Sequence, residues 1–142
     1  MMRRRYLLVG TLVALVACSD LVAPSDATIA LQVGRSSLVV PDDSAFVTAV
    51  VLDGNGEAVA EHTCITVTTS LGMLRRPEHP NTADKCGGDD PVGNGFVASV
   101  IVPTLSGVAT AVLRTVADTG TATVSATSGK VKAETQVEFV AN

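Results

Sequence analysis

The sequence predicts an all-β fold, a sandwich of about seven to nine short strands. From Ala27 onward, apolar residues recur at every second position, which is the period of a strand and not of a helix. The runs are short and end at Gly, Asp or Asn, the residues that favour turns. No stretch longer than a turn carries a helical spacing of apolar residues.

Two strands near the C-terminal end show the pattern most clearly. In residues 121–127, Ala122, Val124 and Ala126 fall on one face and hydroxyl side chains on the other. In residues 136–140, Val137 and Phe139 alternate with polar residues. Similar runs predict eight strands in chain order, at residues 29–33, 38–40, 45–52, 64–69, 96–102, 108–115, 121–127 and 135–140.

The strand at residues 45–52 is ambiguous because it is apolar on both faces. One possible inward set is Val47, Ala49 and Val51. The other is Phe46, Val50 and Leu52. A slip of one residue would exchange the two faces completely. Alternation by itself therefore leaves both orientations open.

The N-terminus has the layout of a secretory signal. Residues 1–5 include three arginines, and residues 6–17 form an uncharged apolar run that is too short to span a bilayer. The stretch Leu15-Val16-Ala17-Cys18 resembles the bacterial lipobox, in which the Cys is acylated and the signal is cleaved just before it. The alternative is an ordinary cleaved signal. The resemblance implies a signal peptide at residues 1–17 and lipidation of Cys18.

Lipidation would leave residues 18–26 as the lipidated Cys and a short polar tether, and residues 27–142 as one domain. The expected location is the bacterial cell envelope, with the domain anchored to a membrane and facing the periplasm or the cell surface. Ser19 follows the Cys in place of the Asp that retains some lipoproteins in the inner membrane. This favours the outer membrane.

Composition and motifs argue against two classes of function. The chain has 14 Asp and Glu against 10 Lys and Arg, whereas nucleic-acid binding needs clustered Lys and Arg. No nucleic-acid partner is therefore expected. The sequence holds neither a Gly-x-Ser-x-Gly motif nor a phosphate-cradling Gly loop. We expect a protein that is not an enzyme and uses no cofactor.

Five stretches resemble the bacterial Ig-like repeats of the invasin and intimin type, in the same order as in that family. They are VTAVV (47–51), DGNGEAV (53–59), SLGML (70–74), GVATAVL (107–113) and GTATVSA (120–126). The resemblance implies an immunoglobulin-like Greek-key β-sandwich. It also implies that Val47, Ala49 and Val51 form the buried face of their strand.

The resemblance further implies a non-enzymatic structural, adhesive or binding module with a protein or cell-surface ligand. An accessory subunit that docks on a larger envelope complex through a sheet edge is an alternative. A second alternative is a metal-binding protein. The family pattern does not account for residues 75–95, which are longer than such a domain needs, and long loops are often functional. The candidate binding residues in this loop are Arg75, Arg76, His79, Lys85, Asp89 and Asp90.

Two cysteines remain once Cys18 is acylated. We expect Cys64 and Cys86 to form a disulfide in an oxidising compartment. If the neighbouring strand residues face the core, Cys64 points outward and the bridge ties the loop across a sheet face. The metal-binding alternative uses His62, Cys64, His79 and Cys86, which are suited to zinc but match no familiar spacing.

Two acidic segments resemble calcium sites weakly. Residues 53–57 begin like a calcium loop, but the positions that need Gly and Glu hold Ala58 and Cys64. A hairpin turn is the expected structure there. In the sequence, Gly87 and Gly88 stand between two acidic positions. A solvated acidic loop is expected there rather than a site, and its acidic residues are Asp84, Asp89 and Asp90.

Overall fold

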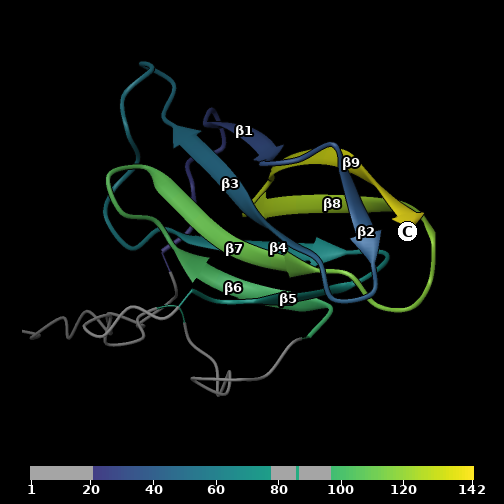
Figure 1. Ribbon diagram of the computed structural model, residues 1–142. Helices are drawn as coiled ribbons and strands as arrows, with labels where there is room; N and C mark the ends of the chain where they lie inside the picture. The colour runs from purple at the N-terminus through teal and green to yellow at the C-terminus, as the bar shows by residue number, and fades with distance from the viewer. Residues whose placement is uncertain (1–20, 78–85, 87–96) are drawn as a thin grey trace, which may run out of the picture.

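The computed structural model describes residues 21–77, 86 and 97–142, and these residues form a sandwich of two sheets with no helix (Figure 1). No helix long and apolar enough to cross a membrane is found in this described part. The four-stranded sheet has the order β1 (Thr28–Val33), β3 (Ser44–Leu52), β7 (Val108–Arg114), β5 (Met73–Arg75). The five-stranded sheet has the order β2 (Ser37–Val40), β9 (Val131–Ala141), β8 (Gly120–Ser128), β4 (Cys64–Thr69), β6 (Ser99–Pro103). The predicted all-β sandwich is confirmed.

The core lies between the two sheets and is built by strict alternation. Its largest fully buried side chains include Leu38, Ile65, Leu74, Leu113 and Phe139, which come from both sheets. The predicted inward residues of β8 and β9 are all buried. Each strand thus contributes every second side chain to one shared apolar layer.

The ambiguity of residues 45–52 is resolved in favour of the orientation that the family pattern implied. In β3, Val47, Ala49 and Val51 are buried, whereas 62% of Phe46 is exposed. The registers with β1 and β7 fix this choice, since Val51 lies opposite Ile29 and Val47 lies opposite Ala111. The inner face therefore carries small branched residues and the outer face keeps an aromatic ring.

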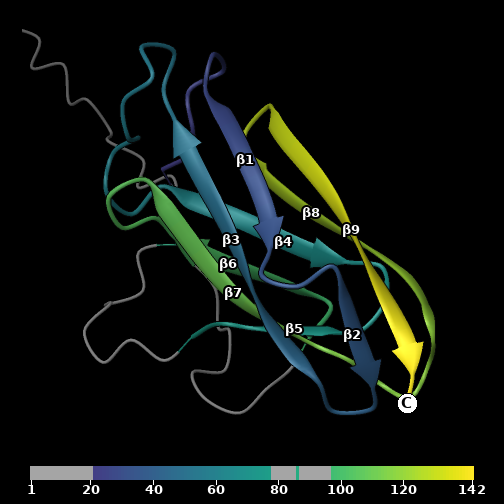
Figure 2. The same ribbon diagram turned by 45° about the horizontal axis from the view of Figure 1, so that its top comes forward.

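The first two strands divide between the sheets, as Figure 2 shows. The strand β1 pairs antiparallel with β3, and the chain then crosses so that β2 pairs in parallel with β9. The hairpin of β8 and β9 pairs with β4, and β4 pairs with β6. Non-sequential neighbours in both sheets give the predicted Greek-key topology.

One observed strand was not predicted, and two predicted strands begin three or four residues away from their predicted start. The strand β5 was not predicted, because three residues are too few to show a period. It begins after Gly72, whose φ of 79° brings the chain so close to Arg114 and Phe139 that a Cβ would lie 2.7 Å from the Arg114 carbonyl oxygen. The strand β6 begins at Ser99, three residues later than predicted, and β9 begins at Val131, four residues earlier.

The described part of the predicted tether, residues 21–26, is packed against the sandwich. The carbonyl of Leu21 accepts a hydrogen bond from the Cys64 amide, and the Ala23 amide donates to the Ser128 hydroxyl. Ala23 and Ala27 are buried in the core. Residues 21–26 show no alternation of apolar and polar residues, because individual hydrogen bonds and not a strand hold this segment in place.

Candidate functional site

The structure describes five of the predicted site residues, one of which is His62, two positions before Cys64. Arg75 ends β5 and Arg76 follows it, while Cys64 begins β4 and Cys86 is bonded to it. The remaining predicted residues lie outside the described part of the chain: Cys18, His79, Asp84, Lys85, Asp89 and Asp90. Phe96, which was predicted to begin a strand, also lies outside it.

The Cys64–Cys86 disulfide is present, with an S–S distance of 2.15 Å and Cα atoms 5.4 Å apart. Ile65 and Val67 face the core, so alternation places Cys64 on the outer side of β4. Both cysteines are nevertheless buried, so the outer side of β4 is covered at this point. Cys64 is covered in part because the chain at Leu21 runs against its amide.

The same disulfide argues against the metal-binding alternative. Neither sulfur is a thiolate, so two of the four proposed ligands are lost. Each sulfur lies 3.7 Å from the His62 carbonyl oxygen, and because a disulfide sulfur carries no hydrogen, these are packing contacts. Within the described residues, no group of three His, Cys, Asp or Glu side chains is arranged to hold a metal ion.

Residues 53–57 form the expected turn. The Asp53 carboxylate accepts hydrogen bonds from the Asn55 and Glu57 amides at 2.9 and 3.0 Å. Gly56, with a φ of 78°, donates its amide to the Asp53 carbonyl. The carboxylate therefore closes the turn, in the manner of an Asx turn.

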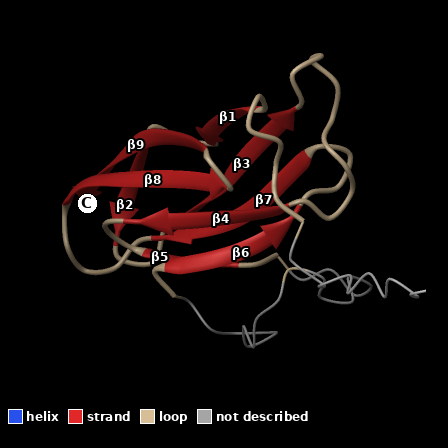
Figure 3. Ribbon diagram, turned by 180° about the vertical axis from the view of Figure 1, so that it is seen from behind, coloured by secondary structure: helices blue, strands red, loops and turns tan. Residues whose placement is uncertain are grey.

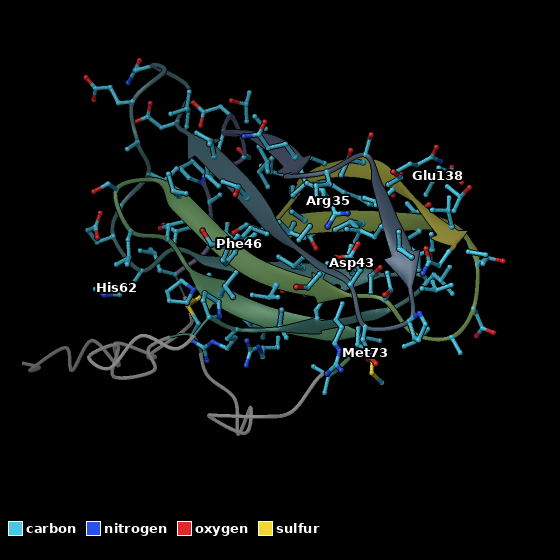
Figure 4. The ribbon with its side chains drawn as sticks, in the orientation of Figure 1. Arg35, Asp43, Phe46, His62, Met73 and Glu138 are labelled. Atoms are coloured by element: carbon cyan, nitrogen blue, oxygen red, sulfur yellow. A yellow bond between two sulfur atoms is a disulfide. The ribbon has the colours of Figure 1, made fainter. Side chains whose placement is uncertain are left out.

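An apolar patch lies on the outer face of the four-stranded sheet. Phe46 of β3 lies opposite Val112 of β7, which lies opposite Arg75 of β5. In the next row toward the end of the sheet, Arg114 lies opposite Met73. Phe46 and Met73 are among the exposed large apolar side chains (Figure 4). We call these five residues the Phe46 patch.

A shallow hollow borders the Phe46 patch and is lined by Asp42, Ser44, Arg75, Val112 and Arg114. The Arg114 guanidinium donates to the Asp42 carboxylate at 2.6 Å, and both side chains are well exposed. Exposed ion pairs of this kind contribute little to stability. The hollow is open to solvent, so it is suited to seat a side chain of a partner rather than to enclose a small molecule.

A turn held by Asp43 supports one edge of this hollow. The Asp43 carboxylate accepts from the Val39 amide at 3.0 Å and from the Arg35 guanidinium at 2.8 Å, and Figure 4 shows the two labelled side chains close together. The Val39 hydrogen bond, followed by the one from Arg35, lowers the pKa of Asp43 below its ordinary value of 3.8. The turn thus positions Asp42 and Ser44 on the hollow.

The outer face of the five-stranded sheet is mostly polar, although Val140 near the end of β9 is exposed by 39%. The Thr121 hydroxyl donates to Glu138 at 2.8 Å, and Lys132 pairs with Glu134 at 2.9 Å. The hydrogen bond from Lys132 lowers the pKa of Glu134. Figure 3 shows this sheet from its outer side.

Of the five residues of the Phe46 patch, sequence reasoning selected only Arg75. The signal for the patch was present in residues 45–52, where the outward set includes Phe46, Val50 and Leu52. Alternation in residues 45–52 posed the question of which face points inward, and not the question of why both faces are apolar. A strand with one sheet face in water needs no apolar residues on that side, so the second apolar set in the sequence was the signal from which the exposed Phe46 could have been noticed.

Comparisons with known proteins bear on the fold. No family model matches the sequence, and no curated protein matches it. Solved structures do match. A C-terminal intimin fragment in complex with the intimin-binding domain of its receptor, Tir, has a TM-score of 0.54 at 21% identity, covering 79% of this chain and 33% of that one. The Yersinia pseudotuberculosis adhesin InvE gives 0.56 at 18%, covering 86% and 28%.

A member of glycosyl hydrolase family 2 from Bacteroides cellulosilyticus matches as well, with a TM-score of 0.55 at 18% identity, covering 84% of this chain and 14% of that one. The chain therefore spans a third or less of each of these three structures. These structural matches show a shared immunoglobulin-like sandwich fold, and at identities this low they show the fold alone. Because the same fold occurs in adhesins and in a hydrolase, function must be argued from surface residues.

Proposed function

We propose that this protein is a non-catalytic, lipid-anchored binding module of the bacterial envelope, and that it binds a protein partner through the Phe46 patch. The observation that carries the proposal is the exposure of Phe46, at 62%, in the middle of a regular sheet. Leaving an aromatic ring in water forgoes a burial worth about 1.5–3 kcal/mol. A partner that covers the ring recovers that free energy.

The composition of the Phe46 patch fits a protein partner. Phe, Met and Arg are enriched in the centres of protein–protein interfaces, whereas Lys and Glu are depleted there. The patch combines Phe46, Met73 and Val112 with the guanidinium groups of Arg75 and Arg114. A partner with an apolar side chain flanked by carboxylates would match this arrangement.

Edge docking, the alternative mode, has less support. Three edge strands are short, with three residues in β5, four in β2 and five in β6. The strand β6 ends in Pro103, which has no amide hydrogen to donate. The fourth edge strand, β1, packs against β9. Short or covered edges resist added strands.

The fold neighbours support a binding role without naming a ligand for this chain. One neighbour is an intimin fragment crystallised with a receptor domain, and another is an adhesin. The predicted loop at residues 75–95 begins in the patch, because Arg75 belongs to both. We therefore include this loop in the proposed binding region.

Binding is tested with purified full-length protein and envelope fractions from cells that lack it. Phe46→Ser should lower the fraction that co-sediments by about fivefold or more, because truncation of a buried interface aromatic commonly costs at least 1–2 kcal/mol. The matched control is Thr123→Ser on the outer face of β8. Equal binding of wild type and Phe46→Ser would refute the proposed role of the Phe46 patch in binding.

Anchoring and location need a separate test in cells that express the full-length chain. Metabolic labelling with a fatty acid should mark the wild type and not Cys18→Ala. External protease is then added to intact and to permeabilised cells. Digestion of intact cells supports a surface module, whereas digestion only after permeabilisation supports a periplasmic partner and excludes adhesion.

A further inference from the structure

One end of the sandwich gathers the N-terminal segment and the segments that hold it. The Cys64 amide at the start of β4 donates a hydrogen bond to the Leu21 carbonyl, and the Ala23 amide donates one to the Ser128 hydroxyl at the end of β8. The Ser128 hydroxyl in turn donates to the Cys64 carbonyl at 2.8 Å. One buried hydroxyl therefore connects the segment to two strands.

The turn between β8 and β9 packs on the same segment. A Cβ at Gly129 would lie 3.4 Å from the Ala23 carbonyl oxygen and 3.4 Å from the Val22 side chain. We call this the entry end, and it consists of residues 21–27, the turn at 128–131 and the segments at 53–63 and 104–107. Leu21, Val22 and Leu105 lie here and are exposed by 47%, 51% and 41%.

The chain between Cys18 and the entry end is short. From Cys18 to Leu21 there are three residue steps, which span at most about 11 Å when fully extended. Each headgroup layer of a bilayer is about 5–8 Å thick. A lipid on Cys18 would therefore hold Leu21 next to the headgroups, and the hydrogen bonds of Leu21 and Ala23 would pass that restraint to the sandwich.

We propose that the entry end faces the bilayer and rests on its surface, so that the Phe46 patch is turned away from the membrane. The inference rests on the proposed lipidation of Cys18. The patch lies toward the opposite end, because Phe46 is the third residue of β3 and that strand runs toward the entry end. Figure 4 shows Met73 and Glu138 at the end away from His62.

Charge does not supply this attachment. Asp26, Glu57 and Glu61 lie at the entry end together with Lys130, so the end is not a basic surface for anionic lipid. The acyl chains, the short connection and the exposed apolar side chains hold it instead. The orientation is therefore expected on neutral phosphatidylcholine.

Fluorescence quenching tests the orientation. Full-length lipidated protein with its disulfide intact is placed in phosphatidylcholine vesicles that contain lipid with a nitroxide on the headgroup. A fluorophore is attached at Lys130→Cys or at Asp118→Cys, which lie beyond opposite ends of β8, about 26 Å long. Quenching at position 130 should exceed that at position 118 by about threefold or more.

Two variants identify the cause of the orientation. Insertion of twelve Gly and Ser residues between Asp20 and Leu21 should bring the quenching ratio close to one, because the domain could then tumble. Ser128→Ala, which removes the shared hydroxyl, should lower the ratio in the same direction. A ratio that the insertion leaves unchanged overturns the role of the short connection.

The outcomes separate this inference from the proposed function. Vesicle-bound wild type with equal quenching at both positions overturns the orientation alone. Wild type that fails to float with the vesicles overturns the lipid anchor and this inference together. Phe46→Ser, by contrast, should leave the ratio unchanged, so failure of the binding test does not affect this measurement.

Discussion

The outer faces of the two sheets differ in what they expose. On the outer face of the five-stranded sheet, Thr121 of β8 pairs with Glu138 of β9, and Glu134 pairs with Lys132 of the same strand. The outer face of the four-stranded sheet exposes Phe46 by 62% and Met73 by 41%, whereas the five-stranded sheet exposes Val140, near the end of β9, by 39%. Exposed apolar patches commonly mark surfaces that bind a partner. This difference is the reason that we propose a protein contact on the outer face of the four-stranded sheet.

The largest expected effect is a difference in stability between two substitutions, one on the inner and one on the outer side of the four-stranded sheet. Leu113 and Val112 are neighbours in β7, but Leu113 is fully buried and Val112 belongs to the Phe46 patch on the outer side. Leu113→Ala should lower the free energy of unfolding by about 2–5 kcal/mol. Val112→Ala should lower it by less than about 1 kcal/mol.

Urea denaturation of both full-length variants measures this difference. Equal losses would mean that the outer apolar residues are part of the structural packing. The comparison between the two outer faces would then carry no functional meaning.

The disulfide offers a second test, with a somewhat smaller effect. Replacing Cys64 and Cys86 together with Ala should lower the free energy of unfolding by about 3 kcal/mol, since the bridge joins residues 22 apart. The Phe46 patch lies on the other sheet, so co-sedimentation of the folded protein should fall less than with Phe46→Ser, by only what the loop at residues 75–95 contributes. Lost binding with a folded sandwich would instead assign recognition to the loop at residues 75–95.

The smallest effect concerns Asp43, beside the hollow. Its pKa is lowered in the folded state by the Val39 amide and by Arg35, so its ionised form stabilises the fold. That stabilisation is present above the unfolded pKa, about 3.9, and is lost as the pH falls through the lower folded pKa.

Asp43→Asn should therefore reduce the fall in Tm between pH 6 and pH 3 by a small amount. Glu134→Gln, which removes a carboxylate whose pKa is also lowered, is the comparison on the five-stranded sheet. If Asp43→Asn loses as much stability on acidification as the wild type, ionised Asp43 does not contribute to the stability of the fold.

Much of the fold was predictable because alternation reports burial directly. The inward residues of β8 and β9 follow from a period of two, and the orientation of β3 follows from its likeness to the Ig-like pattern. The strand β5 was not predictable in this way, since it depends on Gly72 passing over Phe139. That close approach is a tertiary contact with no local periodicity.

Little of the candidate site was predictable, for a related reason. Phe46, Val112 and Arg75 are far apart in the chain and meet through the registers of three strands. The packed segment at residues 21–26 depends in the same way on Ser128. The disulfide was predictable from the cysteine count, but its burial was not.

The central claim is that the outer face of the four-stranded sheet contacts a protein and that the outer face of the five-stranded sheet does not. The most direct test places a photo-activated benzophenone amino acid at position 46 or at position 123 in the full-length protein, expressed in its own cells. We expect one discrete adduct with a protein at position 46 and none at position 123. No adduct at position 46, or equal adducts at both positions, would contradict the claim.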